Sequence, residues 1–308
     1  DRDWMSAGQI VAFLSYFAII QTATLGLAKL FVKYSKGVAS ARRIEEILLA
    51  PEDQQVQPEG KTPGEGPELG MGNVSFSYLG VEKDLDGAAF SLKKGETLGI
   101  LGPTGAGKTT LVSLLLRLYD ADSGVVWLGG RDVSTLSREQ LRGRFGVVFQ
   151  NEALLNESVY ENISFLRNLS RERVTAAART AQAWEFIEKL PDGLDARLDI
   201  RGANLSGGQR QRLLIARALA ARPGILILDS ADSALDYRTA AALHAAIRRD
   251  FPEVTLVVIS ERVASLREAD RILVLEEGRI TAQGTHEELL KACGRYRRMA
   301  ELQMGGLK

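Results

Sequence analysis

One stretch of the chain has the residue types and spacing of a loop that binds phosphate. Residues 99–111 read GILGPTGAGKTTL and contain the pattern GxxxxGK[ST] between an apolar run and a helix-like segment. Glycines at this spacing let backbone N–H groups surround phosphate oxygens, and the following helix adds the positive end of its dipole. Lys108 is expected to reach the β- and γ-phosphates of a nucleotide, and the Thr109 hydroxyl to ligate Mg²⁺. The predicted nucleotide-binding residues are Gly102, Pro103, Thr104, Gly105, Ala106, Gly107, Lys108, Thr109 and Thr110.

A second apolar run ends in a carboxylate that suits the same ion. Residues 225–229 read ILILD, and Asp229 closes what we predict to be a buried strand. A carboxylate at the end of such a strand holds or orients the Mg²⁺ of a bound nucleotide in P-loop proteins. Asp229 is therefore predicted to be a metal ligand together with Thr109.

The elements that position these residues follow from the hydrophobic pattern. Short β-rich segments such as TLGIL, FGVVF, VTLVVIS and RILVL alternate with helical stretches after residue 71. Continuous apolar strands separated by helices indicate an α/β fold with a mostly parallel sheet that is covered on both faces. Residues 155–219 are mostly helical in pattern, which predicts an inserted helical subdomain.

The N-terminal segment has a different composition. Residues 4–28 contain no charged side chain, and a helix of this length spans about 37 Å, enough to cross a hydrocarbon core of about 30 Å. The basic residues that follow it predict a cytosolic C-terminal side. Ser15, Gln21, Thr22 and Thr24 suggest a transmembrane helix that packs against others or lines a watery pathway. The alternative is a buried helix of a soluble protein.

The helical pattern continues to about residue 50, where Pro51 is expected to end it. Residues 51–70 are rich in Pro, Gly and charge and are predicted to form a linker. The predicted organisation is thus a transmembrane helix with a cytosolic extension over 1–50, the linker, and one nucleotide-binding domain over 71–308.

Composition excludes several classes of function. The 39 basic and 39 acidic residues give no net charge, which argues against a nucleic-acid partner. The single cysteine, Cys293, cannot form an intrachain disulfide. The two histidines, His244 and His286, lack the spacing of metal ligands and are predicted to lie on the surface.

Four motifs carry a resemblance to a known family. VVFQ (147–150), LSGGQRQR (205–212), ILILD (225–229) and SALD (233–236) follow the phosphate loop in the order and spacing of ATP-binding cassette (ABC) transporters. Residues 71–308 resemble the nucleotide-binding domain of an exporter, and residues 1–50 resemble its last transmembrane helix. The resemblance implies ATP and Mg²⁺ as ligands, an antiparallel β subdomain beside the parallel sheet, and a location in the inner or plasma membrane with the nucleotide-binding domain in the cytoplasm.

The resemblance also implies roles for residues outside the phosphate loop. Tyr78 lies where the family stacks an aromatic ring on adenine, and Gln150 lies where it contacts Mg²⁺ and the attacking water. Asp236 lies where the family crosses a dimer interface. The signature segment is implied to bind the γ-phosphate of ATP held by a second subunit, through Ser206, Gly207, Gly208 and Gln209.

Two positions of the catalytic site depart from the family pattern. Hydrolysing members carry Glu after the Asp229 position, and this chain carries Ser230, which has no comparable basicity at neutral pH. Glu261 stands where the family carries a His that contacts the γ-phosphate, and its charge is unfavourable there unless it turns away. Asp232 is expected to point elsewhere and not to replace the missing base. A softer difference is Ile200, where exporters often carry Glu.

These observations favour one subunit of a heterodimeric exporter. Its own site would bind ATP more than hydrolyse it, while its intact LSGGQ would complete a competent site on a second half-transporter. The alternatives are a homodimeric switch gated by ATP and a self-sufficient transporter with an unusual base. Membrane lipid is an expected neighbour, and the cargo, a small molecule, lipid or peptide, is left open.

Overall fold

The computed structural model describes residues 6–50, 56, 66–150 and 152–304. The chain divides into two compact units, residues 1–55 and 56–308, and each is described by itself. Most of the predicted linker and Pro51 lie outside the described residues, as do Trp4 and Met5 of the apolar run.

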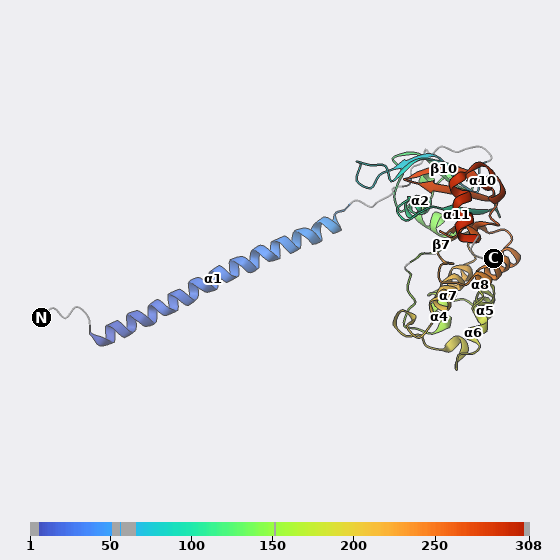
Figure 1. Cartoon of the computed structure of the whole chain (residues 1–308). Helices are drawn as coiled ribbons and strands as arrows, with labels where there is room; N and C mark the ends of the chain where they lie inside the picture. Colours follow the sequence, from blue (N-terminus) through green and yellow to red (C-terminus); the bar gives the residue numbers. More distant parts are fainter. Residues whose placement is uncertain (1–5, 51–55, 57–65, 151, 305–308) are drawn as a thin grey trace. The chain divides into compact units, whose positions relative to one another are not determined.

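The first unit contains one helix, α1 (Ala7–Leu48), which is 42 residues long and uninterrupted (Figure 1). Ser6 begins it with a capping box, because its side chain accepts from Gln9 N and the Gln9 side chain accepts from Ser6 N. At about 1.5 Å per residue such a helix is about 63 Å long, twice the hydrocarbon thickness. Its apolar half and its cytosolic extension are thus one continuous element, as predicted, and none of its residues is buried within the chain.

The hydroxyl groups of α1 are satisfied inside the helix. Ser15 donates to the carbonyl of Val11 at 2.9 Å, and Thr22 and Thr24 make the same bond to the carbonyls four residues before them. A hydroxyl that bonds its own helix backbone needs no partner from outside. These three residues therefore do not by themselves require a neighbouring helix or a watery pathway.

The second unit holds two sheets. The first is antiparallel, in the order β2-β1-β4-β5, and the second has the order β10-β9-β3-β8-β7-β6, in which all strands except β10 run parallel. This confirms the predicted α/β fold with an antiparallel β subdomain. The strands are β1 (Leu69–Phe76), β2 (Leu85–Leu92), β3 (Thr97–Leu101), β4 (Ser123–Leu128), β5 (Arg131–Asp132), β6 (Phe145–Val148), β7 (Ile225–Asp229), β8 (Thr255–Ile259), β9 (Arg271–Glu276) and β10 (Arg279–Gly284).

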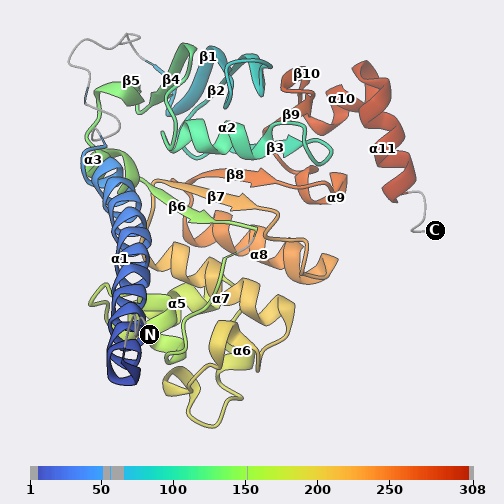
Figure 2. The same cartoon turned by 90° about the vertical axis from the view of Figure 1, so that its left-hand side faces the viewer.

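Helices cover both faces of the parallel sheet. Helix α2 (Lys108–Leu115) lies between the two sheets, and α8 (Tyr237–Asp250) lies across the parallel sheet from it (Figure 2). Successive residues of β7 therefore enter different cores: Ile225 and Ile227 pack with α2, whereas Leu226 and Leu228 pack with the helices on the other side. Each such buried aliphatic side chain contributes about 1.5–3 kcal/mol, and this double burial explains the unbroken apolar runs in the sequence.

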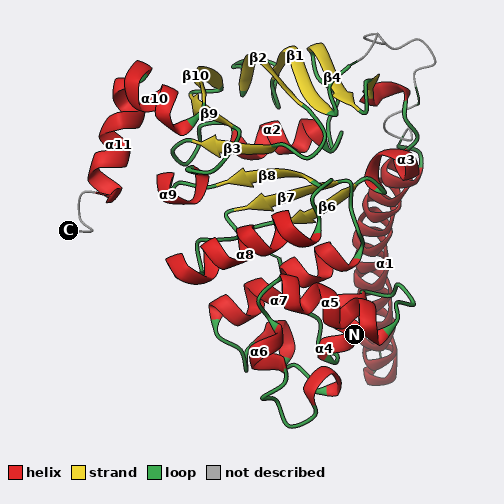
Figure 3. Cartoon of the chain, turned by 90° about the vertical axis from the view of Figure 1, so that its right-hand side faces the viewer, coloured by secondary structure: helices red, strands yellow, loops and turns green. Residues whose placement is uncertain are grey.

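The predicted helical subdomain is present between β6 and β7 (Figure 3). Arg217 on its longest helix is only 5% exposed. It donates to the carbonyl of Asn162 at 2.8 Å, to Asn162 Oδ1 at 3.0 Å and to Glu152 Oε1 at 2.9 Å, and it stacks on Phe165. These contacts fix the segment that follows Gln150 against the helical subdomain. Its helices are α4 (Val159–Ser164), α5 (Arg171–Thr180), α6 (Trp184–Ile187) and α7 (Gly207–Ala220).

The C-terminal helices close the edge of the domain. Helix α11 (Gly294–Met304) packs on α9 (Val263–Leu266), and α10 (His286–Ala292) packs on β10. Helix α3 (Arg138–Arg142) lies at the other end of the domain, near β5 and β6 (Figure 2). The prediction that His286 lies on the surface is wrong. Its side chain is 7% exposed, and its Nδ1 is 2.8 Å from the Tyr296 hydroxyl, because α10 and α11 fold against each other. His244 is also partly buried.

Burial makes stability depend on pH through these histidines. Burial lowers the pKa of His286 and of His244, so both are neutral in the folded chain near pH 7. An unfolded histidine takes a proton near pH 6.5, and the unfolded state therefore binds more protons below that pH. We expect the melting temperature of the chain to fall as the pH drops from 7 to 5.5.

Replacing His286 with Gln isolates one contribution, because Gln can still bond the Tyr296 hydroxyl without titrating. The difference in unfolding free energy between pH 7 and 5.5 is expected to shrink by at most about 1 kcal/mol in H286Q, with the His244 contribution left in place. Thermal melts of both proteins at the two pH values measure this. An equal pH dependence in both would show that His286 takes up its proton without cost.

Candidate functional site

The phosphate loop joins β3 to α2 and is held open by backbone geometry. Gly105 and Gly107 have φ angles of +81° and +98°, in the left-handed region that favours glycine. A Cβ on Gly107 would lie 2.8 Å from the carbonyl oxygen of Asp84, so a larger residue would also clash. Ala106 and Thr110 are buried, at 3% and 6% exposed.

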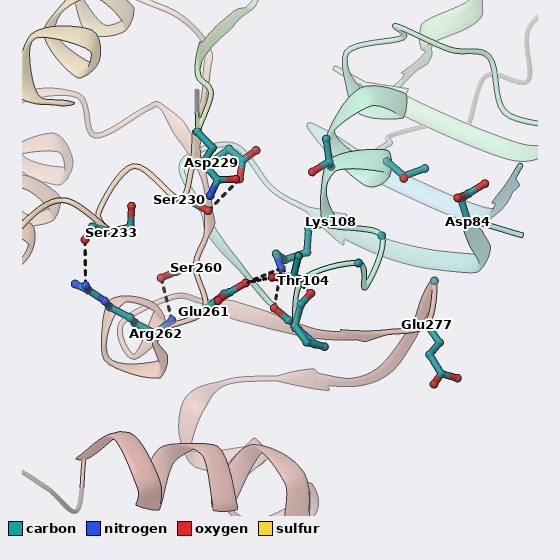
Figure 4. A pocket seen from close by; sticks show the side chains of 18 of the residues that line it. Asp84, Thr104, Lys108, Asp229, Ser230, Ser233, Ser260, Glu261, Arg262 and Glu277 are labelled. Atoms are coloured by element: carbon teal, nitrogen blue, oxygen red, sulfur yellow. Dashed lines mark hydrogen bonds and ion pairs between the residues drawn. The ribbon is translucent and has the colours of Figure 1, made fainter. Parts of the chain in front are cut away.

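Lys108 lies at the centre of the site. Its Nζ donates to the carbonyls of Gly102 and Pro103, both at 2.8 Å, and lies 3.4 Å from Glu261 Oε1 (Figure 4). The Thr104 hydroxyl donates to the same Glu261 oxygen at 3.2 Å. Glu261 therefore does not turn away from the loop. It is the counter-ion of the lysine that is expected to hold phosphate.

Asp229 closes β7 beside the loop and is 8% exposed. Burial raises the pKa of its carboxyl, and the Ser230 hydroxyl, which donates to it at 3.4 Å, opposes that shift. Ser230 has a φ of +54°, in the left-handed region, so the chain turns sharply at the residue after the strand. Figure 4 shows the Ser230 hydroxyl directed toward Asp229. Position 230 therefore supplies a hydroxyl and no basic group.

These residues line one cleft of about 1310 Å³. The structure brings together most of the residues predicted for the site, from four separate segments of the sequence. The predicted residues that line the cleft are Gly102, Pro103, Thr104, Gly105, Gly107, Lys108, Thr109, Thr110, Gln150, Asp229, Ser230 and Glu261.

The signature segment and Tyr78 do not line this cleft. Ser206 begins α7 with a capping box, accepting from Gln209 N at 3.2 Å while Gln209 Oε1 accepts from Ser206 N at 2.9 Å. Ser206 and Gly207 are exposed, so the start of this helix presents free donors to another molecule. Tyr78 is 44% exposed and packs edge-to-face on Phe76 and Tyr119, at 4.9 and 5.0 Å between ring centroids.

The donor set fits a magnesium nucleotide. Mg²⁺ is usually bound by one or two protein oxygens together with the substrate phosphates, and Thr109, Gln150 and Asp229 offer such oxygens at the mouth of the loop. Within the described part of the chain, no cluster of three His, Cys, Asp or Glu residues could hold a metal without those phosphates.

Asp232 borders the cleft, but it is only 4% exposed, and its carboxylate is buried. The expectation that it does not stand in for the missing base is not contradicted. Asp232 Oδ2 accepts from the Ser260 hydroxyl at 3.3 Å, and Asp232 Oδ1 is buried without a hydrogen-bond partner. The carboxylate is thus in the cleft wall, although it is held against Ser260.

Arg262 and Gln303 are two of several cleft residues that were not predicted from the sequence. Arg262 donates to the carbonyls of Ser233 and Leu235, at 3.0 and 3.2 Å, and so holds the SALD loop. Gln303 on α11 donates to the carbonyl of Glu261 at 2.8 Å and accepts from Val263 N at 2.7 Å. Neither residue belongs to a recognisable motif. Arg262 follows the atypical Glu261, and Gln303 lies in a helix whose sequence has no functional motif.

A glycine-rich loop between a parallel strand and a helix, a lysine in that loop and an aspartate closing a neighbouring strand define a P-loop nucleotide-binding domain. Residues 85–233 match the family described as ABC transporter. The chain belongs to this family, and it has the arrangement of an exporter-type half-transporter, with a transmembrane helix followed by a nucleotide-binding domain.

Individual relatives agree with this assignment. The chain is 39% identical over 306 residues to an ATP-dependent lipid A-core flippase of Methylobacillus flagellatus, covering 97% of this chain and 52% of the relative. It is 36% identical over 296 residues to a fatty acid ABC transporter ATP-binding/permease protein of Mycobacterium bovis, covering 96% and 47%. The chain thus spans about half the length of these curated relatives.

A solved structure of a bacterial Atm1-family ABC exporter with ATP bound is also similar, with a TM-score of 0.79 and 34% identity over 87% of this chain and 47% of that one. The predicted membrane location is confirmed: the chain is an inner-membrane protein whose nucleotide-binding domain lies in the cytoplasm.

Proposed function

We propose that the chain is an ATP-binding subunit of an exporter whose own P-loop site binds Mg-ATP and hydrolyses it slowly. The observation that carries this proposal is the pair of departures in one cleft. Ser230 replaces a base and bonds Asp229, while Glu261 sits 3.4 Å from Lys108 Nζ. Loss of a general base lowers the rate of hydrolysis by about 10²–10⁴. ATP is therefore expected to stay bound at this site and to be hydrolysed only slowly. Thr109, Gln150 and Asp229 would hold the Mg²⁺.

The signature segment has the opposite character. Its exposed helix start and the capping box between Ser206 and Gln209 are intact, and the segment is not among the residues that line the chain's own cleft. We propose that Ser206, Gly207, Gly208 and Gln209 bind the γ-phosphate of ATP on a second half-transporter. That subunit would carry the missing Glu and His, and ATP at the first site would hold the two together. Tyr78 would stack on the adenine of the first site.

The cargo is a small molecule, lipid or peptide. Two relatives are named for lipid A-core and for fatty acid, and this favours an amphiphilic lipid among the three. In the transporter, α1 would be the last transmembrane helix, residues 51–70 a linker, and residues 71–308 the nucleotide-binding domain.

A homodimer is the second candidate, because nothing about Ser206 or Asp236 selects a different partner. Two copies would give two sites without a base, and ATP would act as a gate. Purification of a tagged chain from native membranes in ATP, followed by intact-mass analysis, separates the two. A second ABC subunit with Glu after its strand-ending Asp supports the heterodimer. Recovery of this chain alone, with or without fast ATP turnover, rejects it.

A further inference from the structure

The contact between Glu261 and Lys108 bears on which nucleotide the cleft prefers. The loop backbone surrounds the α- and β-phosphates, and the lysine reaches the β- and γ-phosphates. The γ-phosphate is therefore the group that projects from the loop toward the end of the Lys108 side chain. Glu261 Oε1 already lies there, 3.4 Å from Lys108 Nζ and 3.2 Å from Thr104 Oγ1.

The backbone around Glu261 is fixed on both sides. Gln303 bonds the Glu261 carbonyl and Val263 N, at 2.8 and 2.7 Å. On the other side, Ser260 is 2% exposed and its N–H donates to the carbonyl of Ile100 on β3 at 3.1 Å. The segment cannot carry Glu261 away from the loop without breaking these bonds, so only the side chain is free to move.

Arg262 adds a third restraint. Its guanidinium donates to the carbonyls of Asp232, Ser233 and Leu235, at 3.5, 3.0 and 3.2 Å, and therefore points away from the phosphate loop toward the SALD loop (Figure 4). The arginine next to Glu261 is thus committed elsewhere and cannot neutralise the carboxylate. Lys108 is the cation that pairs with Glu261, and it is the same lysine that a γ-phosphate would need.

We infer that Glu261 sets the nucleotide preference of this cleft by lowering the affinity for ATP relative to ADP. ADP brings only its β-phosphate to Lys108, and the Glu261 carboxylate beyond it can stay where it is. ATP brings further negative charge to the lysine and must displace the carboxylate or bind beside it. A neutral side chain at 261 would remove this penalty from ATP alone. The inference rests on the proposed function, since it takes the cleft to be a nucleotide site.

Solvent limits the size of the effect. The Glu261 side chain is 59% exposed, so water and salt screen much of the repulsion between its charge and the γ-phosphate. A charge pair a few ångströms apart at a protein surface then shifts a binding equilibrium by about tenfold. The expected consequence is a site at which ADP competes with ATP, and which stays occupied as the ratio of the two nucleotides varies.

The test compares ATP and ADP on the full chain purified on its own, in detergent with Mg²⁺, by displacement of a fluorescent ADP analogue. In E261Q the ratio of the ADP to the ATP dissociation constant is expected to rise about tenfold, through tighter ATP binding. E261D keeps the charge and is expected to stay near the native ratio. E277Q removes a carboxylate that lines the cleft away from Lys108 (Figure 4), and it is expected to leave the ratio unchanged.

The possible results distinguish failure of this inference from failure of the proposed function. Nucleotide binding by the native chain with a ratio that changes less than twofold in E261Q would overturn the inference and leave the proposed function standing. An equal rise in E261Q and E277Q would also overturn it, because general charge would then be the cause. Absence of binding of either nucleotide to the native chain would overturn both.

Discussion

A chain that carries Ser230→Glu and Glu261→His together is expected to hydrolyse ATP about 10²–10⁴ times faster at its own P-loop site than the native chain. Glu at 230 would supply a base beside Asp229, which the Ser230 hydroxyl does not. His at 261 would free Lys108 from its counter-ion and remove a negative charge from the phosphates. Single-turnover phosphate release by the assembly extracted from its native membrane measures the change as a second fast phase, added to that of the competent site on the second subunit.

The matched control is S230Q with E261H, which has the same size at position 230 but no basic group. It is expected to bind ATP as the first variant does and to remain slow. Both variants place a long side chain at a position with a φ of +54°, so any backbone strain is common to them. Equal rates in the two would show that the base is not what the native site lacks, and the proposal of an impaired site would then fail.

Arg217→Ala is expected to lower the free energy of unfolding of the nucleotide-binding domain by about 3–5 kcal/mol. The guanidinium is 5% exposed and satisfies the carbonyl and the side chain of Asn162 and one oxygen of Glu152. Its loss removes the donor to the Asn162 carbonyl and to Glu152, leaves Asn162 Oδ1 with only the Leu155 N–H, and removes the contact with Phe165. Denaturant unfolding followed by far-UV circular dichroism measures the change.

Arg171→Ala is the control of similar chemistry on the surface. Arg171 bonds both oxygens of Asp195, but both side chains are largely exposed, and pairs of this kind contribute little. The unfolding midpoint of R171A is expected to stay near that of the native chain. If R217A lowered the free energy of unfolding as little as R171A does, water would have to replace the guanidinium as hydrogen-bond donor inside the helical subdomain.

The parts of the fold that were predictable are those whose causes are local. The phosphate loop follows from glycine spacing, and the buried strands follow from apolar runs that must face two cores at once, as Ile225 and Leu226 do. The helical subdomain was recognisable because its periodicity changes between β6 and β7.

The parts that were not predictable depend on how distant segments meet. Asp232 borders the cleft with its carboxylate held against Ser260, and a contact between residues so far apart leaves no trace in the sequence. His286 is buried because α11 brings Tyr296 back against it. For Glu261 the sequence indicated a charge that is unfavourable beside the phosphates. Only the structure shows that this carboxylate contacts Lys108 and Thr104.

The hydrogen bonds of Gln303 connect the end of α11 to the segment of the nucleotide site that carries Glu261. Gln303 lies in the last turn of α11, one residue before Met304, and it bonds the backbone on both sides of Arg262. A protease or a fusion that frays this turn would loosen the segment that carries Glu261, although it touches no phosphate-binding residue. Nucleotide affinity is therefore expected to be sensitive to trimming at residue 302.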